Sequence, residues 1–402
     1  MTPGGRLQGR GLLALLGALV AFGPLAIDLY LPALPAIAQG LGADIARVQL
    51  SVTVFLAGFC IGMLGYGPVS DHFGRRPVLL GGIALFVGAS AVCALAPGVE
   101  VLIAARFFQA LGGGAASVLA RAVARDVYAP TEAIRMLSLM AMVTAVAPLV
   151  APLLGGLALA WQGWRACFGL LVGWGLLCLL VCARHLPETL PPARRGQTRL
   201  GAAFGVYGQM LRDPAGLGLV LAGGMSFAAM FAYITAGPFY FIELQGFTPF
   251  GYSLLFAANA LGIFAANFAN SRLVRRVGAP AMIRAGCLLG LAGALPLPFI
   301  GAHPAWVMAA LFVVVGVTGL LGANCVGLLM QGYGHNAGAA AALFGAGQFG
   351  FGMLASWATG HFHEGSGQPM AWVILVASSL SALGFALHRS CHDPRFQPPS
   401  AA

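Results

Sequence analysis

Long apolar stretches recur along this chain and restrict what it can fold into. From Pro77 to Val99, for example, no charged residue occurs. About 20 apolar residues in a helix are enough to cross the hydrocarbon core of a bilayer. We place twelve such stretches, near residues 11–33, 48–68, 78–97, 99–120, 134–158, 165–184, 215–241, 250–271, 281–301, 304–326, 338–360 and 370–388. The pattern predicts an all-α membrane protein with twelve transmembrane helices.

The charged residues exclude several classes of protein. They make up 8% of the 402 residues, against roughly 25% in a soluble domain, so a soluble or disordered chain is excluded. All 21 basic residues are Arg, whereas a Walker A loop and a Schiff-base enzyme both need Lys. The eight cysteines contain no C-x-x-C pair, so we expect no zinc site. We therefore expect a protein that is not an enzyme, without metal or cofactor.

The Arg residues also predict the orientation in the membrane. With the N-terminus inside, 18 of the 21 fall at cytoplasmic ends, among them Arg6 and Arg199, and three (Arg47, Arg106 and Arg165) do not. Cytoplasmic loops of membrane proteins carry such an excess of positive charge. The bias indicates both termini in the cytoplasm. It also makes the lipid bilayer, rather than nucleic acid, the partner of the positive charge.

The longest polar stretch divides the helices into two groups of six. It contains Pro187, Pro191 and Pro192, which favour a linker over a span. We therefore expect an N-terminal six-helix half at 1–186, a cytoplasmic linker at 187–213 and a C-terminal six-helix half at 214–402. Segments 69–77 and 273–280 both carry Gly and paired Arg at matching points of the two halves. Many secondary transporters consist of two such halves around a site at the bilayer midplane.

Four motifs follow one another in the first half of the chain. They are Asp28-Leu-Tyr30-Leu-Pro-Ala-Leu-Pro35 in span 1, Gly67-Pro-Val-Ser-Asp71-His-Phe-Gly74-Arg75-Arg76 after span 2, Arg106-Phe-Phe-Gln109-Ala-Leu-Gly112 in span 4, and Ala147-Pro148-Leu-Val-Ala-Pro152-Leu-Leu-Gly155-Gly156 in span 5. Their order resembles the major facilitator superfamily, and the span 1 motif resembles, within it, the Bcr/CflA type of drug:proton antiporter. The resemblance implies a major facilitator fold, small-molecule substrates, alternating access and a bacterial inner membrane. We expect a monomer.

The residue types in two of these motifs also predict what the motifs do. Gly67, Asp71, Gly74, Arg75 and Arg76 would form a latch, because Gly74 permits a sharp turn and Asp71 can accept hydrogen bonds from Arg and from helix N-termini. The alternative is a simple positive anchor. In span 5, Pro148 and Pro152 kink the helix and Gly155 and Gly156 permit close packing; the resemblance associates this motif with exporters.

Asp28 and Arg106 are the candidates for proton coupling. An ionisable side chain inside a membrane is costly and marks function by default. Arg106 lies about 7 residues, or roughly 10 Å, inside its span and Asp28 about 5 residues from the outer end of its own. A carboxyl group that alternates between a protonated and an Arg-paired form would carry protons. The alternatives are that Arg106 snorkels to the outer surface and that Asp28 caps a helix or faces an outer vestibule.

The cargo is less sharply defined by the sequence. Polar and aromatic residues in the spans are candidate contacts, namely Tyr30, Gln109, Phe231, Tyr233, Asn259 and Asn324. A pocket with few charges suits neutral or weakly polar molecules. The resemblance implies drug-like cargo of the chloramphenicol or bicyclomycin type. A native metabolite, such as an amino acid or a sugar-like compound, is the alternative cargo, and a membrane enzyme or receptor is the alternative class.

Overall fold

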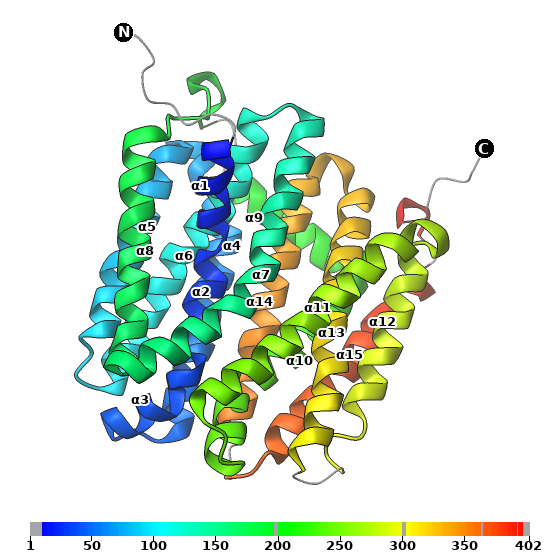
Figure 1. Ribbon diagram of the computed structural model, residues 1–402. Coiled ribbons are helices and arrows are strands. Elements are labelled where there is room, and N and C mark those ends of the chain that lie inside the picture. The colour runs from blue at the N-terminus through cyan, green and yellow to red at the C-terminus, as the bar shows by residue number, and fades with distance from the viewer. Residues whose placement is uncertain (1–9, 197–199, 300–302, 363–364, 392, 397–402) are drawn as a thin grey trace. The chain divides into compact units, whose positions relative to one another are not determined.

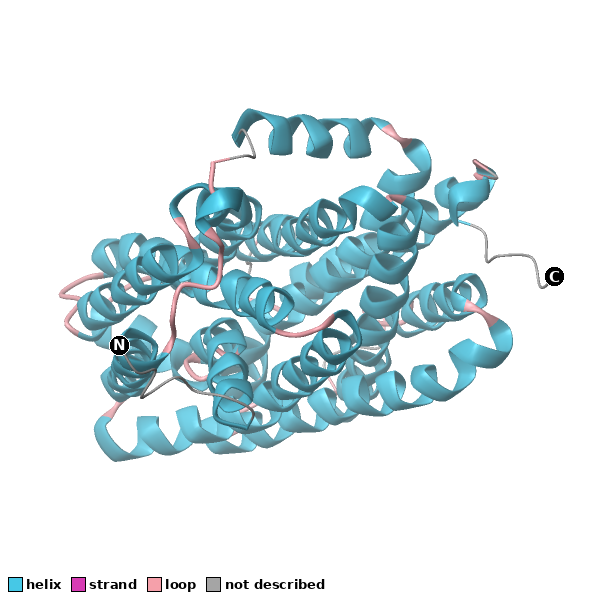
Figure 2. Cartoon of the chain, turned by 90° about the horizontal axis from the view of Figure 1, so that it is seen from above, coloured by secondary structure: helices cyan, strands magenta, loops and turns pink. Residues whose placement is uncertain are grey.

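The computed structural model describes residues 10–196, 200–299, 303–362, 365–391 and 393–396. Throughout these ranges the regular elements are helices, without a strand (Figures 1 and 2). Contacts within the chain divide it into two compact units, residues 1–202 and 203–402. Of the Arg residues used to predict the orientation, Arg6 and Arg199 lie outside the described residues.

Unit 1 contains six predicted spans, coloured blue to green in Figure 1. Its elements are α1 (Arg10–Val20), α2 (Phe22–Asp28), the 3-10 helix η1 (Leu31–Ala33), α3 (Leu34–Leu41), α4 (Ile45–Phe73), α5 (Arg75–Ala94), α6 (Val99–Val127), α7 (Pro130–Gln162), α8 (Trp164–His185) and η2 (Pro192–Arg194).

Unit 2, coloured green to red, contains the remaining spans. Its elements are α9 (Leu200–Arg212), whose first residues precede the unit boundary, α10 (Pro214–Pro238), the π-helical η3 (Phe239–Leu244), α11 (Pro249–Val277), α12 (Ala279–Ala294), α13 (Pro304–Gly332), η4 (Gly334–Asn336), α14 (Ala337–His361), α15 (Gln368–Ser390) and η5 (Pro394–Phe396).

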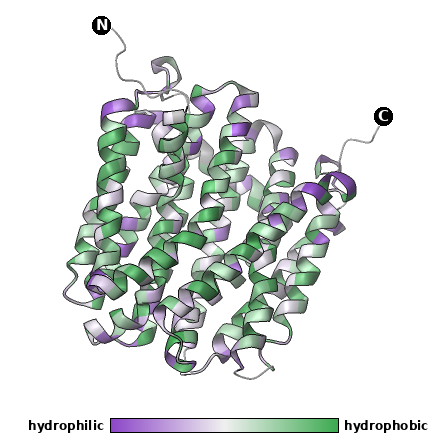
Figure 3. Cartoon of the chain, in the orientation of Figure 1, coloured by the Kyte–Doolittle hydropathy of each residue, from purple (hydrophilic) through white to green (hydrophobic). Residues whose placement is uncertain are grey.

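Eleven helices in the described part of the chain are long and apolar enough to cross a membrane. The twelfth predicted span, 281–301, corresponds to the shorter α12, followed by a series of turns from Leu295 to Phe299; its residues 300 and 301 lie outside the described residues. Pro296 and Pro298 explain the early end of α12, since proline lacks the N–H that a helix interior needs. Apolar residues dominate the middle of the helices and polar residues gather at their ends (Figure 3).

The segments 69–77 and 273–280, which their Gly and paired Arg predict to be tight cytoplasmic loops, are almost entirely helical. The α4 helix continues through Phe73 and α11 continues through Val277, so that a single glycine separates each from the next helix. Gly74 has φ 100° and ψ 154°, and Gly278 has φ 81° and ψ 156°. Because these backbone angles favour glycine, the repeat seen in the sequence is also a repeat of backbone geometry. We call the end of each unit that carries this glycine the linker end.

The predicted linker, 187–213, contains a helix that the sequence reading missed. This helix, α9, occupies Leu200–Arg212, and Tyr207 and Met210 are buried whereas Phe204 and Leu211 are exposed.

Candidate functional site

The first span of unit 1 is broken where Asp28 lies. The α2 helix ends at Asp28, the chain turns, and helical structure resumes through η1 and α3 to Leu41. Proline is accepted in the first turn of a helix, so Pro32 and Pro35 start new helical segments at the place where we expected the span to end. Asp28 therefore lies 13 residues before the end of this helical stretch, compared with the predicted 5.

Asp28 is buried but not paired. Its exposed fraction is 5%, and its carboxyl group forms no hydrogen bond or ion pair with any residue that the structure describes. The pair with Arg106 that the sequence suggested is thus not formed in this structure. The physical reason lies in the surroundings of Arg106, which provide other acceptors.

Arg106 on α6 is enclosed inside unit 1, with no exposed surface. Its Nη1 donates to the carbonyl oxygen of Ala26 at 2.9 Å and to Oε1 of Gln109 at 2.5 Å. The guanidinium carbon lies 4.3 Å from the ring centre of Tyr30 and 4.1 Å from that of Phe55. Two aromatic faces at this distance stabilise a desolvated cation. Snorkelling of Arg106 to the surface is therefore wrong for this structure.

Part of the guanidinium remains without a partner. Neither Nε nor Nη2 of Arg106 donates a hydrogen bond to any described residue. Since Nη1 binds the backbone of Ala26, two residues before Asp28, the positive charge lies beside the segment that carries the buried carboxyl group. The arrangement provides a fixed cation with spare donors, bonded to the backbone of the segment that carries an unpaired acid.

Two residues that we expected to contact cargo lie against Arg106 in this structure. Gln109 accepts from Arg106 and donates through Nε2 to Ser90 Oγ at 2.8 Å. Tyr30 covers one face of the guanidinium, and its hydroxyl group is 2.6 Å from Ser51 Oγ. The sequence did not predict that Ser51, Ser90 and Phe55 belong to the surroundings of Arg106. The two serines were detectable as rare polar residues in apolar spans, whereas nothing in the sequence distinguished Phe55 from other phenylalanines.

The glycine motif of α7 packs on the break in the first span. A Cβ atom added to Gly155 would lie 1.8 Å from the carbonyl oxygen of Leu29, the residue after Asp28. Gly156 is also buried, and the helix remains continuous through Pro148 and Pro152. The motif thus lets α7 approach the backbone that holds Asp28.

The predicted latch residues form a network of charges at the linker end of unit 1. Arg75 pairs with Asp71 at 2.6 Å and with Asp126 at 3.0 Å, and it donates to Ser70 Oγ at 2.5 Å. The sequence reading missed Asp126, which lies at the far end of α6. A Cβ atom added to Gly67 would meet no atom within 4 Å, so no steric contact explains the glycine at this position.

Glu188 completes this network by capping α5. Its carboxylate accepts from the backbone N–H of Arg75 at 2.9 Å and of Arg76 at 3.2 Å. We expected Asp71 to be available to helix N-termini, but in unit 1 this position belongs to Glu188. A Cβ atom on Gly74 would lie 2.5 Å from the Glu188 carboxylate, so Gly74 is required both by its positive φ and by this close approach. Arg76 reaches the carbonyl oxygen of Ala183 at 2.7 Å.

The cargo candidates in unit 2 have different surroundings. Asn324 on α13 donates to Oδ1 of Asn270 at 2.7 Å and to its own helix at Leu320, which is typical of polar contacts between membrane helices. Phe231 packs between α10 and α14, where it contacts Phe349. The ring of Tyr233 stacks on the ring of Phe256. Asn259 is almost completely buried.

Asp213 organises the linker end of unit 2. It accepts from Tyr333 Oη at 2.6 Å and from Arg395 Nη2 at 2.7 Å, and it caps α10 at Ala215 N. Burial by itself would raise the pKa of Asp213, but the hydrogen bonds from Tyr333 and Arg395 outweigh it and hold the pKa of this carboxyl below its usual value. Phe396 packs on Tyr333 with ring centres 5.9 Å apart. These contacts attach the end of the chain to α10 and α13.

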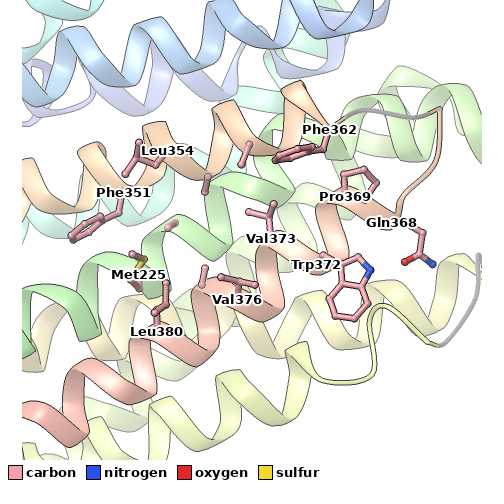
Figure 4. A pocket seen from close by; sticks show the side chains of 14 residues that line it. Met225, Phe351, Leu354, Phe362, Gln368, Pro369, Trp372, Val373, Val376 and Leu380 are labelled. Atoms are coloured by element: carbon pink, nitrogen blue, oxygen red, sulfur yellow. The ribbon is translucent and has the colours of Figure 1, made fainter.

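Unit 2 also contains a cavity of about 570 Å³ between α10, α14 and α15 (Figure 4). Its walls are apolar, for example Met225, Phe351 and Val376, and the polar Gln368 and the indole of Trp372 lie at one end. Gln368 donates to the carbonyl oxygen of Pro298. No sequence-predicted cargo residue lines this cavity.

Comparisons with known proteins agree with the helical architecture. The family model described as "Major Facilitator Superfamily" matches residues 14–356. The chain is 36% identical to the uncharacterized MFS-type transporter YdgK of Bacillus subtilis, over 92% of this chain and 93% of that protein. It is 29% identical to the bicyclomycin resistance protein homolog of Haemophilus influenzae, over 92% and 94%.

Among solved structures, the fold is similar to that of a bacterial homolog of the human lysosomal transporter Spinster, in its inward-facing and occupied conformation. The TM-score is 0.74 and the match covers 97% of this chain and 98% of that one. At 14% sequence identity this likeness concerns the fold alone.

Proposed function

Because the chain belongs to the Major Facilitator Superfamily, we propose that this transporter is a proton-coupled exporter of small drug-like molecules. The cargo class is that of chloramphenicol- or bicyclomycin-type antibiotics. Support for it comes from the relative named as a bicyclomycin resistance protein homolog and from the motifs shared with drug:proton antiporters.

The observation that supports proton coupling is the enclosed Arg106, which binds the backbone of Ala26 in the segment that carries the unpaired Asp28. An unpaired carboxyl group in a membrane interior is most easily accommodated in its protonated form. Movement of Asp28 towards the spare N–H groups of Arg106 would favour the ionised form and release the proton. One conformational step of the first span would thereby couple to the gain or loss of one proton.

The proposal also concerns the two halves of the chain, its oligomeric state and its membrane. The two six-helix halves, 1–186 and 214–402, alternate access to a cargo site, and the 187–213 linker lies in the cytoplasm with both termini. The protein acts as a monomer in a bacterial inner membrane. One proton that crosses 100 mV releases about 2.3 kcal/mol, which supports roughly a fiftyfold concentration ratio of cargo.

The latch and the α7 glycines serve the same cycle in this proposal. The charge network around Arg75 holds the linker end of unit 1 together, and Gly155 lets α7 support the break at Leu29. Tyr30 and Gln109 act through Arg106, while Phe231, Tyr233, Asn259 and Asn324 contact or support the cargo site. An exporter of a native metabolite with the same coupling residues is the second candidate.

The test is cargo uptake by proteoliposomes under an imposed pH gradient. We expect the wild type to accumulate chloramphenicol against its gradient, and Asp28→Asn to lose accumulation because an amide does not titrate. Exchange of labelled for unlabelled cargo, which needs no net proton movement, should survive in the variant. Asp44→Asn is the matched control, since Asp44 is an exposed acid of the same unit. Uphill transport by Asp28→Asn at the wild-type rate would refute the coupling role.

A further inference from the structure

Asn259 on α11 is the most unusual polar side chain of unit 2. Its exposed fraction is 1%. Neither its Oδ1 nor its Nδ2 forms a hydrogen bond with any residue in the described ranges. The side chain thus has both an acceptor and two donor hydrogens unused in a buried place, whichever way the amide is turned.

Several other buried polar side chains of this unit form hydrogen bonds. Asn270 and Asn324 bond to each other, and the hydroxyl groups of Thr235 and Ser356 lie 2.9 Å apart. A buried polar group without a partner costs free energy and calls for an explanation. Asn270 lies on α11 as well and accepts a hydrogen bond from Asn324 of α13, so the unbonded amide of Asn259 is not a general feature of the asparagines of α11.

Aromatic rings surround the same stretch of α11. Phe256 precedes Asn259 by three residues, so that both side chains lie on one face of the helix. The ring of Tyr233 on α10 stacks on Phe256, with ring centres 5.8 Å apart and an interplanar angle of 18°. Tyr252, one turn before Phe256, lies 6.2 Å from it. These rings offer flat apolar surfaces beside a bare amide.

We propose that Asn259, with the rings of Tyr233 and Phe256, recognises a neutral cargo through a cis amide, as found in a lactam or a primary amide. This inference rests on the proposed export function and specifies its cargo. Since Asn259 is enclosed in this structure, cargo reaches it in a state in which the surrounding helices have moved, as alternating access requires.

The chemistry selects this class of ligand. A carboxamide offers N–H and C=O side by side, and its full complement is a group that offers the same two atoms side by side. Primary amides and cis amides in rings do so, whereas an open-chain trans amide points its N–H and C=O in opposite directions. No Asp, Glu, Arg or Lys occurs in 214–242 or 249–271, so the stretches around the site carry no charge that would attract a charged cargo.

The experiment uses three ring compounds of nearly equal shape. Dihydrocarbostyril is an aromatic lactam, its N-methyl derivative lacks the N–H, and dihydrocoumarin has an ester in place of the amide. Binding to the purified full-length transporter is measured by the thermal shift that each compound produces. We expect the lactam to bind at least about tenfold more tightly than the other two, because a site built around a hydrogen bond rejects analogues that cannot form it.

Two substitutions locate this selectivity. Asn259→Ala should abolish the difference among the three compounds, and Asn259→Leu, which keeps the volume, should do the same if the alanine variant is unstable. Thr359→Val is the control and should retain the difference, because the buried hydroxyl group of Thr359 on α14 already donates to the carbonyl oxygen of Ala355. Equal binding of all three compounds to the wild type, no binding of any, or full selectivity in Asn259→Leu would each overturn the inference.

Transport separates this inference from the function on which it rests. If wild-type proteoliposomes show no uphill movement of any compound while lactam selectivity persists in binding, export is refuted and the amide site is supported. If chloramphenicol is exported but the three ring compounds bind equally, export stands and the amide site is refuted.

Discussion

Substitution of Gly155 by Ala tests how closely α7 supports the proton-coupling segment. The added Cβ atom would lie 1.8 Å from the carbonyl oxygen of Leu29 and 2.7 Å from its carbonyl carbon. Real Cβ atoms do not approach other heavy atoms closer than 3.0 Å. The backbones of α7 and of the break must therefore separate by at least 1.2 Å, the difference between 3.0 and 1.8 Å.

Two opposing effects set the magnitude. Replacement of glycine by alanine inside a helix stabilises it by about 1 kcal/mol. Overpacking of a close contact costs about 1–3 kcal/mol, and occasionally more. Here the obstacle is backbone, which cannot rotate away as a side chain can, so the cost lies at the upper end. We expect a net loss of about 2 kcal/mol in stability.

Transport should suffer more than stability. Leu29 follows Asp28 directly, so a displaced Leu29 carbonyl group moves the carboxyl group relative to Arg106. A misplacement of about 1 Å costs on the order of 100-fold where geometry is decisive. The assay is the initial rate of uphill cargo transport in proteoliposomes at fixed pH gradient, with the melting temperature of the same preparation in detergent.

Gly173→Ala is the matched control. Gly173 lies inside α8 of the same unit, and a Cβ atom there would meet no atom within 4 Å. This variant should transport like the wild type and melt at an equal or higher temperature. If Gly155→Ala behaved in the same way in both measurements, the argument from the Leu29 contact would be refuted.

Two further predictions concern the linker ends. Glu188→Gln should weaken the cap of α5 at Arg75 by about 1 kcal/mol, because a neutral amide is a poorer acceptor than a carboxylate at a helix N-terminus; a lower melting temperature checks it. Asp213→Asn should free the end of the chain by removing the ion pair with Arg395 and weakening the bond from Tyr333, at a cost of about 1 kcal/mol, read out as faster proteolysis of the C-terminus. Since the pKa of Asp213 is held below its usual value, the stabilisation by this carboxylate is present above the unfolded pKa, about 4, and is lost as pH falls through the lower folded value. Wild-type proteolysis should therefore stay unchanged between about pH 5 and 8.

Each of these predictions has a specific contradiction. Asp126→Asn is the comparison for Glu188→Gln, because it removes a charge from the same network without uncapping α5; equal effects on helix stability would argue against the cap. For the second unit, a C-terminus that became sensitive to protease near pH 6 in the wild type would show that Asp213 does not control its attachment.

The sequence by itself was sufficient for the order of the membrane spans and for many of their limits, although it did not predict α9. Span 165–184 became Trp164–His185, and span 338–360 became Ala337–His361. The reason is that a long apolar stretch has one way to satisfy its backbone in a membrane, which is to bond to itself as a helix. Local signals also carried some details, such as the glycine at position 74, whose backbone angles depend on near neighbours.

Tertiary structure alone decided the partners of the buried polar groups. Glu188, the acid that caps α5, is 113 residues away in sequence from Arg75. Arg106 donates hydrogen bonds to Ala26 and Gln109 and not to Asp28, the partner that the sequence suggested. Asn324 and Asn259 look alike in sequence, yet of the two only Asn324 has a hydrogen-bond partner among the residues that the structure describes. The donor and acceptor of a hydrogen bond lie about 3 Å apart, so the packing of the helices decides which groups are joined. The sequence of a single apolar stretch does not determine how that helix packs against the others.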